Sequence, residues 1–582
     1  MVKRIAVVMV LASTLFCEAW AAVNGGAEAN RGPVAPELSK AILDHKRPKL
    51  AVLLVFDQLT AEYLTRFSDQ FLPAEGSDGK KGGFRWLQEK GAYYADAHYT
   101  HVPTFTGPGH ATIMSGANLA DSGIIANDWV TSAGLNVNCV GDPNARVVGA
   151  PISRKLSSAS PVNLQVSTVG DELRLSNNGQ SKVIGIAIKD RGAILPSGRN
   201  SNATVWFDSG VGKWITSSYY GEALPGFAER ANREKLADRW VGEKWDYLLP
   251  KENYNRSHAE GAAKGETDAR GLGTTFPKII APDGVADKEY YERLIFTPYG
   301  NALTFETAKL AVEMEKLGQS GQTDLLTVSC SSPDLAGHSY GPQSPEMQDM
   351  VLRTDRQISD FLNFLDKALP GGLADTYVIL TSDHAVAPMP DWAADFGKLD
   401  GSRILYSRLT SEAKAALAER FPDKTSETLV TKFGEPYLYL HLARLADSGI
   451  DRRAAQEAIA DRLRRIPGVY TTYTRYDIEH GLLPKTSASD AIYNGFHPER
   501  SGEVLVLCEP FKYASSSSNG TTHGSRFNYD THVPILFCGN GIKPGTYAGK
   551  VDVRDIAPTL SFLLGIKAPS GSTGRVLDEM LR

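Results

Sequence analysis

The chain has 582 residues and a formal net charge of −5, with 42% hydrophobic and 22% charged residues. This balance is typical of a globular chain that is long enough to bury a large core. It lacks the strongly basic character of proteins that hold nucleic acid, so we expect no stable nucleic-acid partner.

The first segment predicted along the chain is a secretion signal. Lys3 and Arg4 precede a short apolar run, and Ala21 ends a small-residue cleavage pattern. The run is too short to span a bilayer, and no later segment is apolar enough to do so. We therefore expect a signal peptide at 1–21, a surface arm at 22–47 and a periplasmic or secreted catalytic domain at 48–582, without a membrane partner.

Continuous apolar runs next predict buried parallel strands that each lead to an acidic residue. Leu50–Phe56 leads to Asp57, Leu325–Cys330 leads to Asp334, and Tyr377–Thr381 leads to Asp383. Another strand candidate, 533–537, follows His523, and segments 306–317 and 348–369 carry apolar residues at helical spacing. This rhythm predicts an α/β fold, a three-layer α/β/α sandwich around a mostly parallel sheet.

Two stretches are interpreted as additions to this core. Residues 128–280 are rich in aromatic residues and end in a polar, glycine-rich segment, so we expect a cap with a long irregular loop. Residues 390–500 combine strand-like runs with an amphipathic helix and predict a small α/β subdomain.

Four cysteines remain once the signal is removed, namely Cys139, Cys330, Cys508 and Cys538. Four cysteines allow three pairings, and the sequence does not choose among them. Cys330 and Cys538 lie in apolar runs, which is typical of buried free thiols.

Carboxylate and imidazole side chains gather at the predicted carboxyl ends of the strands, where ligands of parallel α/β sheets bind. Asp334 and His338 are four residues apart and share one side of a helical turn, if the loop opens a helix. Asp383 and His384 are adjacent and could reach two neighbouring sites. Each residue alone has a plain structural explanation, such as a helix cap or a turn. Together with Asp57 and His523, they indicate a zinc-like metal centre.

Thr106 is the predicted nucleophile. It precedes a Gly-Pro-Gly turn and a helix-like start, where the helix dipole favours a phosphate group. A threonine hydroxyl is a weak nucleophile, and coordination to a metal would generate the alkoxide that it needs. The alternative interpretation is an N-cap threonine. His110 is expected to support the site without binding metal.

With these residues the chain resembles the alkaline phosphatase superfamily, and more narrowly the bacterial phosphate-irrepressible alkaline phosphatases that use a Thr nucleophile and a Lys/Arg pair. Those enzymes share their sheet with nucleotide pyrophosphatase/phosphodiesterases. The resemblance runs from about Lys49 to the carboxyl terminus. Its motifs are Asp57, Thr106-x-x-Gly109-His110, Asn127-Asp128-Trp129, Lys189-Asp190-Arg191, Asp334-x-x-x-His338, Asp383-His384 and His523-Gly524.

The resemblance implies two Zn²⁺ ions per chain and a two-step reaction through a phosphothreonine. One zinc would be held by Asp334, His338 and His523. The other would be held by Asp57, Asp383, His384 and the nucleophile Thr106. The implied substrates are small-molecule phosphate monoesters, hydrolysed by a monomer that scavenges inorganic phosphate.

Charge then favours a monoesterase over a diesterase. Two zinc ions would be balanced by three Asp carboxylates and an ionised Thr106, so a dianionic monoester needs further positive charge. Lys189 and Arg191 are predicted to alternate along an extended segment and to face the pocket together, with Asn127 as a third phosphoryl contact. The plain alternative is a solvated charged turn at the end of a strand.

Other functions fit the same residues less well. A nucleotide pyrophosphatase/phosphodiesterase would share the metals and the nucleophile, and weaker phosphodiesterase activity is expected in any case. A sulfatase is disfavoured because no C-x-P-x-R segment surrounds Thr106, and a phosphoglycerate mutase is disfavoured by the secretion signal and the Thr nucleophile. The non-enzyme alternative is an exported metal- or phosphate-binding protein with a dead site.

Overall fold

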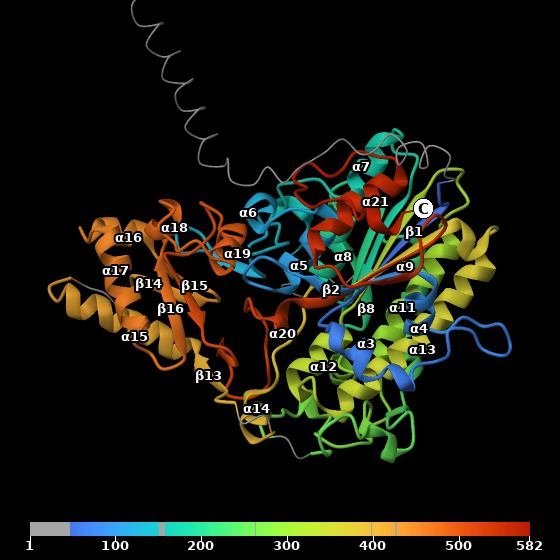
Figure 1. Cartoon of the computed structure of the whole chain (residues 1–582), viewed down its shortest axis with the longest axis horizontal. Coiled ribbons are helices and arrows are strands. Elements are labelled where there is room, and N and C mark those ends of the chain that lie inside the picture. The colour runs from blue at the N-terminus through green and yellow to red at the C-terminus, as the bar shows by residue number, and fades with distance from the viewer. Residues whose placement is uncertain (1–46, 150–157, 262–263, 397–398, 425–427, 582) are drawn as a thin grey trace, which may run out of the picture. The chain divides into compact units, whose positions relative to one another are not determined.

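The computed structural model of the chain describes residues 47–149, 158–261, 264–396, 399–424 and 428–581 (Figure 1). The predicted signal peptide and nearly all of the predicted surface arm lie outside these residues. Within the described ranges, no helix combines the length and the apolar character needed to cross a bilayer.

A central sheet of eleven strands organises the chain. Its strand order is β20-β2-β19-β12-β1-β11-β6-β7-β8-β5, and β21 pairs with β2. The five neighbours from β12 to β7 are parallel, while β19 and β8 run antiparallel to them. The strands in this order are β20 (Gly545–Tyr547), β2 (Ala92–His98), β19 (His532–Cys538), β12 (Thr376–Thr381), β1 (Leu50–Phe56), β11 (Asp324–Cys330), β6 (Val183–Ala187), β7 (Ala203–Asp208), β8 (Lys213–Ser217) and β5 (Val147–Val148), with β21 at Val551–Asp552.

Helices cover both faces of this sheet, which confirms the predicted α/β class (Figure 1). In strand β1 all seven residues are buried, so both faces of the strand need covering helices. Leu50, Val52, Leu54 and Phe56 belong to one core, whereas Ala51, Leu53 and Val55 belong to another. The first core holds α4 (Phe84–Lys90), α9 (Gly226–Arg233), α11 (Pro298–Met314) and α13 (Pro345–Ala368); the second face holds α5 (Thr106–Ser115), α7 (Val169–Ser176), α8 (Asp190–Ser197) and α21 (Ile556–Leu564).

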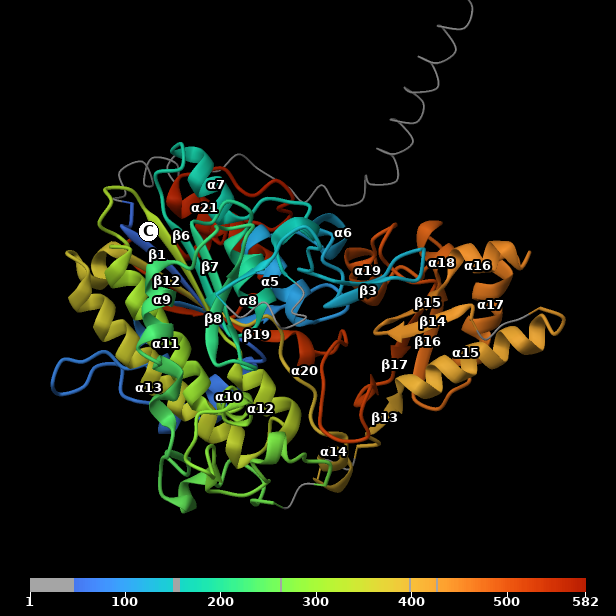
Figure 2. The same ribbon diagram turned by 180° about the vertical axis from the view of Figure 1, so that it is seen from behind.

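A second, smaller sheet has its own hydrophobic core (Figure 2). It consists of β14 (Val430–Gly434), β15 (Tyr437–Leu440), β17 (Val504–Cys508) and β16 (Val469–Thr474). Helices α15 (Tyr406–Arg420), α16 (Leu442–Asp447) and α17 (Arg452–Leu463) contribute to the same core. This sheet falls in the segment expected to form an α/β subdomain, but its strand β17 extends past the predicted end at residue 500.

The expected cap at 128–280 is wrong for its first part. Strands β6, β7 and β8 of this segment belong to the central sheet. The apolar run that forms β6 is fully buried, and Trp206 and Trp214 fill the core beside it instead of covering a pocket. At the start of the segment, β3 (Asp128–Val130) and β4 (Asn136–Asn138) form a separate two-stranded sheet. The part after α9 has the short strands β9 (Lys244–Trp245) and β10 (Lys278–Ile279) and several single helical turns.

The four cysteines within the described residues are free thiols. Cys330 and Cys538 are buried, as predicted, and so is Cys139, whereas Cys508 is half-buried.

A buried ion pair fastens the irregular segment to helix α13. Lys278 Nζ lies 2.9 Å from Glu346 Oε1, with both side chains almost fully inaccessible to solvent, and it lies 4.2 Å from the ring centroid of Tyr340. Removing one partner of such a pair strands a buried charge, whereas removing both does not.

We therefore predict that Lys278→Met lowers the free energy of unfolding by about 3 kcal/mol. Adding Glu346→Leu to the same chain should recover most of that loss. Urea denaturation of the single and double variants measures both effects. An equal or larger loss in the double variant would show that the pair is not what anchors this segment.

Candidate active site

Six of the residues predicted to bind metal lie together beyond the carboxyl ends of β1, β11 and β12. Asp57 follows β1 directly, and Asp383 and His384 follow β12. Asp334 and His338 lie one turn apart on helix α12 (Ser332–Tyr340), as their spacing predicted. His523 lies in the loop before α20 (Asn528–Thr531). Because β12, β1 and β11 are neighbours in the sheet, residues hundreds of positions apart meet at one edge.

The first group of ligand atoms comes from Asp334, His338 and His523, all within 4.8 Å of one another. The Nε2 atoms of His338 and His523 lie 3.1 and 3.6 Å from Asp334 Oδ1. Each imidazole donates its Nδ1–H to a backbone carbonyl, His338 to Thr521 and His523 to Thr104, both at 2.7 Å. These bonds fix the orientation of each ring and leave Nε2 as the atom that would bind a metal once it is deprotonated.

The second group consists of Asp57, Asp334 and His384, again within 4.8 Å. His384 Nε2 lies 3.4 Å from Asp57 Oδ1 and 3.4 Å from Asp383 Oδ2. Its Nδ1–H donates to the Ala385 carbonyl at 3.0 Å. Asp334 thus belongs to both groups and lies between them, while Asp383 reaches the second group through His384.

The charges and the orphaned oxygens of this cluster fit bound cations. Asp57 Oδ1 and Asp383 Oδ2 are buried, and neither has a hydrogen-bond partner among the described residues. Burial, together with the charges of Asp334 and Asp383, raises the pKa of Asp57 well above its usual range. Burial lowers the pKa of His384 to about 3, which keeps that imidazole neutral. Neutral imidazoles and carboxylates are the ligands that zinc accepts.

Lys189 supplies the positive charge that joins the two groups. Its Nζ contacts Asp57 Oδ2 at 2.7 Å and Asp334 Oδ2 at 2.5 Å. The expected extended segment is wrong, because β6 ends at Ala187 and Lys189 is the N-cap residue of helix α8. Asp190 in the first turn explains the helix start: its Oδ1 accepts the Arg191 backbone N–H at 2.7 Å, and a carboxylate there complements the helix dipole.

Arg191 follows in the first turn of α8 and keeps its donors largely free. Its Nε is buried and has no hydrogen-bond partner in the described part of the chain, and its guanidinium lies 3.7 Å from Asp190. A buried donor without a partner is unfavourable, so this guanidinium is suited to an anion that enters the site.

Thr106 is the first residue of helix α5, and Phe105, not Thr106, is the N-cap. Because Thr106 lies inside the helix, the N-cap interpretation of Thr106 is wrong. Thr106 Oγ1 lies 3.4 Å from His384 Nε2, at the edge of the second group. His110 accompanies it, with Nδ1–H donating to the Thr106 carbonyl at 2.9 Å and Nε2 lying 2.8 Å from Ser329 Oγ.

Asn127 faces the same helix start. Its Oδ1 accepts the backbone N–H of Gly107 at 2.8 Å. This bond uses the carbonyl side of the amide and leaves the NH₂ group as a donor. The start of α5 therefore carries an amide donor, while the ammonium of Lys189 contacts Asp57 and Asp334 of the same cluster.

Gln58 is a residue of this site that the sequence did not indicate. It is fully buried and has a φ of 69°, in the left-handed region that non-glycine residues rarely occupy. Its backbone N–H donates to Asp383 Oδ1 at 3.1 Å, and its Nε2 donates to Asp334 Oδ1 at 2.8 Å. A Cβ on Gly337 would lie 1.8 Å from Gln58 Oε1, so a glycine makes room for it. No pattern in one sequence reveals a bond of this kind.

The chain is similar to known proteins along most of its length. A family model described as type I phosphodiesterase/nucleotide pyrophosphatase matches residues 51–530. Alkaline phosphatase PhoV of Synechococcus elongatus is 33% identical over the full length of both chains. Alkaline phosphatase PafA of Elizabethkingia meningoseptica is 33% identical over 92% of this chain and 95% of its own. The crystal structure of wild-type PafA superimposes with a TM-score of 0.85 at 32% identity, covering 92% of this chain and all of that one.

Because the Gln58 side chain donates to Asp334, which lies in both groups, we predict that Gln58→Ala weakens the binding of added Zn²⁺ by about tenfold or more. Competition with a chromogenic chelator measures this change without reference to activity. Gln180→Ala, at an exposed position, is the matched control and should bind zinc normally. Unchanged affinity in Gln58→Ala would contradict a role in positioning the ligands.

Proposed function

The chain belongs to the type I phosphodiesterase/nucleotide pyrophosphatase family and is an alkaline phosphatase, and we propose that it is zinc-dependent and uses Thr106 as its nucleophile. Its proposed substrates are small-molecule phosphate monoesters, from which it releases inorganic phosphate. We further propose that it acts as an exported monomer, after removal of residues 1–21.

One observation carries the monoesterase assignment. The buried Arg191 Nε has no hydrogen-bond partner among the described residues, and the Lys189 ammonium stands between two buried carboxylates nearby. A monoester is a dianion and a diester a monoanion, so two cations beside the nucleophile favour the monoester. Arg191 can grip two phosphoryl oxygens, while Lys189 acts as a compact point charge.

The donor set supports two zinc ions. Asp334, His338 and His523 would hold one ion, and Asp57, Asp383, His384 and Thr106 would hold the other. Asp334 lies close to His384 and Asp57, so its negative charge would reduce the repulsion between two bound cations. When bound, zinc would polarise the phosphoryl oxygens and favour the ionised form of a hydroxyl ligand.

In the first step, different residues of the chain act as nucleophile and as phosphoryl contacts. After the Thr106 hydroxyl has lost its proton to solvent, Oγ1 forms a bond to phosphorus as the bond to the leaving alkoxide breaks. The alkoxide takes a proton from solvent, so the products are a phosphothreonine and an alcohol. Asn127 donates from its fixed amide, and Arg191 binds two of the phosphoryl oxygens. At the start of helix α5 the Gly107 N–H is bonded to Asn127, residue 108 is proline, and the Gly109 N–H is bonded to the Phe105 carbonyl, so these side chains provide the proposed phosphoryl contacts.

The second step returns the enzyme to its starting state. Water attacks phosphorus, the bond to Thr106 Oγ1 breaks, and inorganic phosphate leaves. The same amide, guanidinium and ammonium stabilise the charge of both transition states, because the phosphoryl group stays in place while attacking and leaving oxygens exchange. We propose weaker phosphodiesterase activity, since a diester offers fewer charged oxygens to Lys189 and Arg191.

Two alternative functions predict different results in activity assays. A nucleotide pyrophosphatase/phosphodiesterase would use the same metals and nucleophile but would prefer diesters. An exported metal- or phosphate-binding protein with a dead site would take up zinc without turning over an aryl phosphate.

We predict that Lys189→Ala combined with Arg191→Ala lowers kcat/KM for an aryl phosphate monoester by about 10³-fold or more, because the dianion loses both cations. For the corresponding diester the loss should be about tenfold. Lys213→Ala, at an exposed position on β8, is the control and should change neither value. Equal losses on the two substrates would refute the monoesterase assignment.

We also predict that Thr106→Ala abolishes the covalent intermediate, whereas Thr106→Ser retains it because serine keeps the hydroxyl. Acid quenching with a ³²P-labelled monoester measures the labelled protein, and the zinc content of each variant serves as the folding control. Stable label on Thr106→Ala would place the nucleophile elsewhere.

A further inference from the structure

A second set of potential metal ligands lies on strands β2 and β19. It consists of Asp96, His98 and His532, here called the edge triad, and its ligand atoms lie within 4.8 Å of one another. We propose that the edge triad is a third divalent metal site, selective for a borderline ion such as Zn²⁺. It shares no residue with either catalytic group.

Strand geometry explains why these three side chains meet. Asp96 and His98 are two residues apart on β2, so they project from the same face of the sheet. His532 is the cross-strand partner of His98 in the antiparallel β2–β19 pair. A pair of facing positions plus an i, i+2 neighbour therefore places two imidazoles and a carboxylate on one surface.

The distances within the edge triad match those of the catalytic groups. His98 Nε2 lies 2.9 Å from Asp96 Oδ1, compared with 3.1 Å between His338 Nε2 and Asp334 Oδ1. The rings of His98 and His532 are stacked, with centroids 4.7 Å apart and an interplanar angle of 16°. Two imidazoles and one carboxylate form a three-ligand set that zinc uses with a fourth position open to water.

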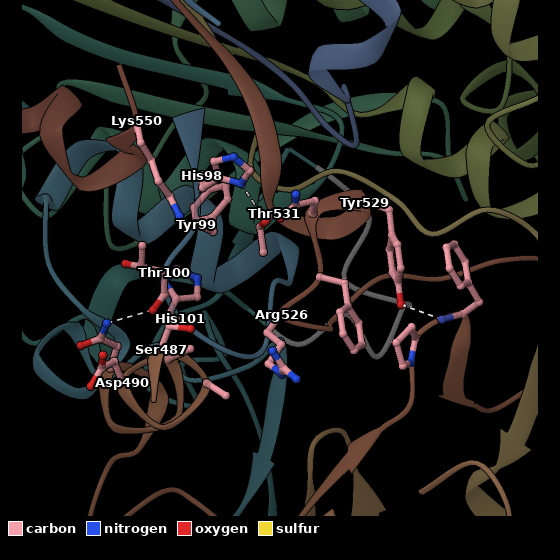
Figure 3. A pocket seen from close by; sticks show the side chains of 17 residues that line it. His98, Tyr99, Thr100, His101, Ser487, Asp490, Arg526, Tyr529, Thr531 and Lys550 are labelled. Carbon is pink, nitrogen blue, oxygen red and sulfur yellow. Dashed lines mark hydrogen bonds between the residues drawn. The ribbon is translucent and has the colours of Figure 1, made fainter. Parts of the chain in front are cut away.

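The bonds behind the ligands favour a metal more specifically. His98 Nε2–H donates to Asp96 Oδ1 at 2.9 Å, and Nδ1 lies 3.0 Å from Thr531 Oγ1, a bond drawn in Figure 3. A bound metal would replace the Nε2 proton, and Nδ1–H would then donate to the Thr531 hydroxyl oxygen. His532 donates Nε2–H to the Ala95 carbonyl at 2.8 Å, which leaves the lone pair on Nδ1. In both catalytic groups, too, one nitrogen of each imidazole bonds a protein oxygen and the other faces the ligand position.

The edge triad is open to an ion from solvent. The Asp96 side chain is 46% exposed, and His98 forms part of the wall of a pocket of about 600 Å³ that Figure 3 shows. The cations Lys550 and Arg526 line that pocket as well. Asp96 is the one carboxylate of the edge triad, so we expect the affinity for a divalent ion to fall strongly when Asp96 is replaced.

A metal here would fasten the sheet edge next to the catalytic loop. Tyr99, beside His98, donates its hydroxyl to the Ser382 carbonyl at 2.9 Å, directly before Asp383. Ala385 N–H donates to the Asp530 carbonyl at 2.9 Å, two residues before His532. Zinc at the edge triad should therefore raise the melting temperature of the protein.

The test is the zinc content of the full chain after dialysis against a buffered micromolar free Zn²⁺ concentration, measured by plasma mass spectrometry. The wild type should hold one more zinc ion per chain than Asp96→Asn combined with His532→Gln. His480→Gln, which removes an exposed imidazole elsewhere, should bind as much zinc as the wild type. Extra zinc should raise the melting temperature of the wild type more than that of the double variant.

Equal zinc content in the wild type and in the double variant would overturn the proposal. Because all three proteins keep the catalytic ligands, failure of the proposed catalytic zinc sites would lower every count together and leave the difference intact. Asp96→Asn alone changes a half-exposed side chain with little change of shape, and it should also lose the additional ion. Retention of that ion in the single, folded variant would likewise count against the site.

Discussion

The feature on which this molecule depends is the burial of three carboxylates at one edge of a parallel sheet. Asp57, Asp334 and Asp383 are each inaccessible to solvent or nearly so. Carboxylates at such close range repel one another and lose their hydration, so they stay ionised only beside compensating cations. The Lys189 ammonium between Asp57 and Asp334 is one such cation. The Nδ1–H groups of His338, His384 and His523 donate to backbone carbonyls, so their Nε2 atoms are the ones that would bind the proposed metal ions. The surrounding fold holds this arrangement in a fixed geometry.

The central sheet brings these carboxylates together because the strands that precede them are neighbours. Strand β1 pairs in parallel with β11 on one side and β12 on the other, with Phe56 opposite Cys330 and Val55 opposite Thr381. Both faces of β1 are buried, which fixes the register of the acidic residues that follow the strands. Close backbone contacts then complete the site. A Cβ at Gly109 would lie 2.0 Å from the Asp383 carbonyl oxygen, so helix α5 brings Thr106 to the second group only because residue 109 is glycine.

Much of the fold and of the site could be predicted, because buried strands and metal-binding residues form recognisable local patterns in the sequence. The apolar runs located β1, β11 and β12 to within one residue, and the helical spacing located α11 and α13 with displaced ends. The cap was misplaced because aromatic residues around Trp206 and Trp214 mark a buried strand as readily as a pocket lining. Lys189 and Arg191 were given the wrong local structure because an apolar strand followed by charges does not reveal that Asp190 starts a helix. Gln58 stayed hidden, since its role consists of two bonds to residues 276 and 325 positions away.

In the proposed mechanism, Lys189 and Arg191 make a two-metal esterase site suited to dianionic substrates. The most direct measurement is the ratio of kcat/KM for an aryl phosphate monoester to that for the matched diester, with the zinc content determined on the same preparation of the wild-type protein. The structure predicts a ratio far above one in protein that holds at least two zinc ions per chain. A ratio below one in fully loaded protein would contradict the claim and identify a phosphodiesterase.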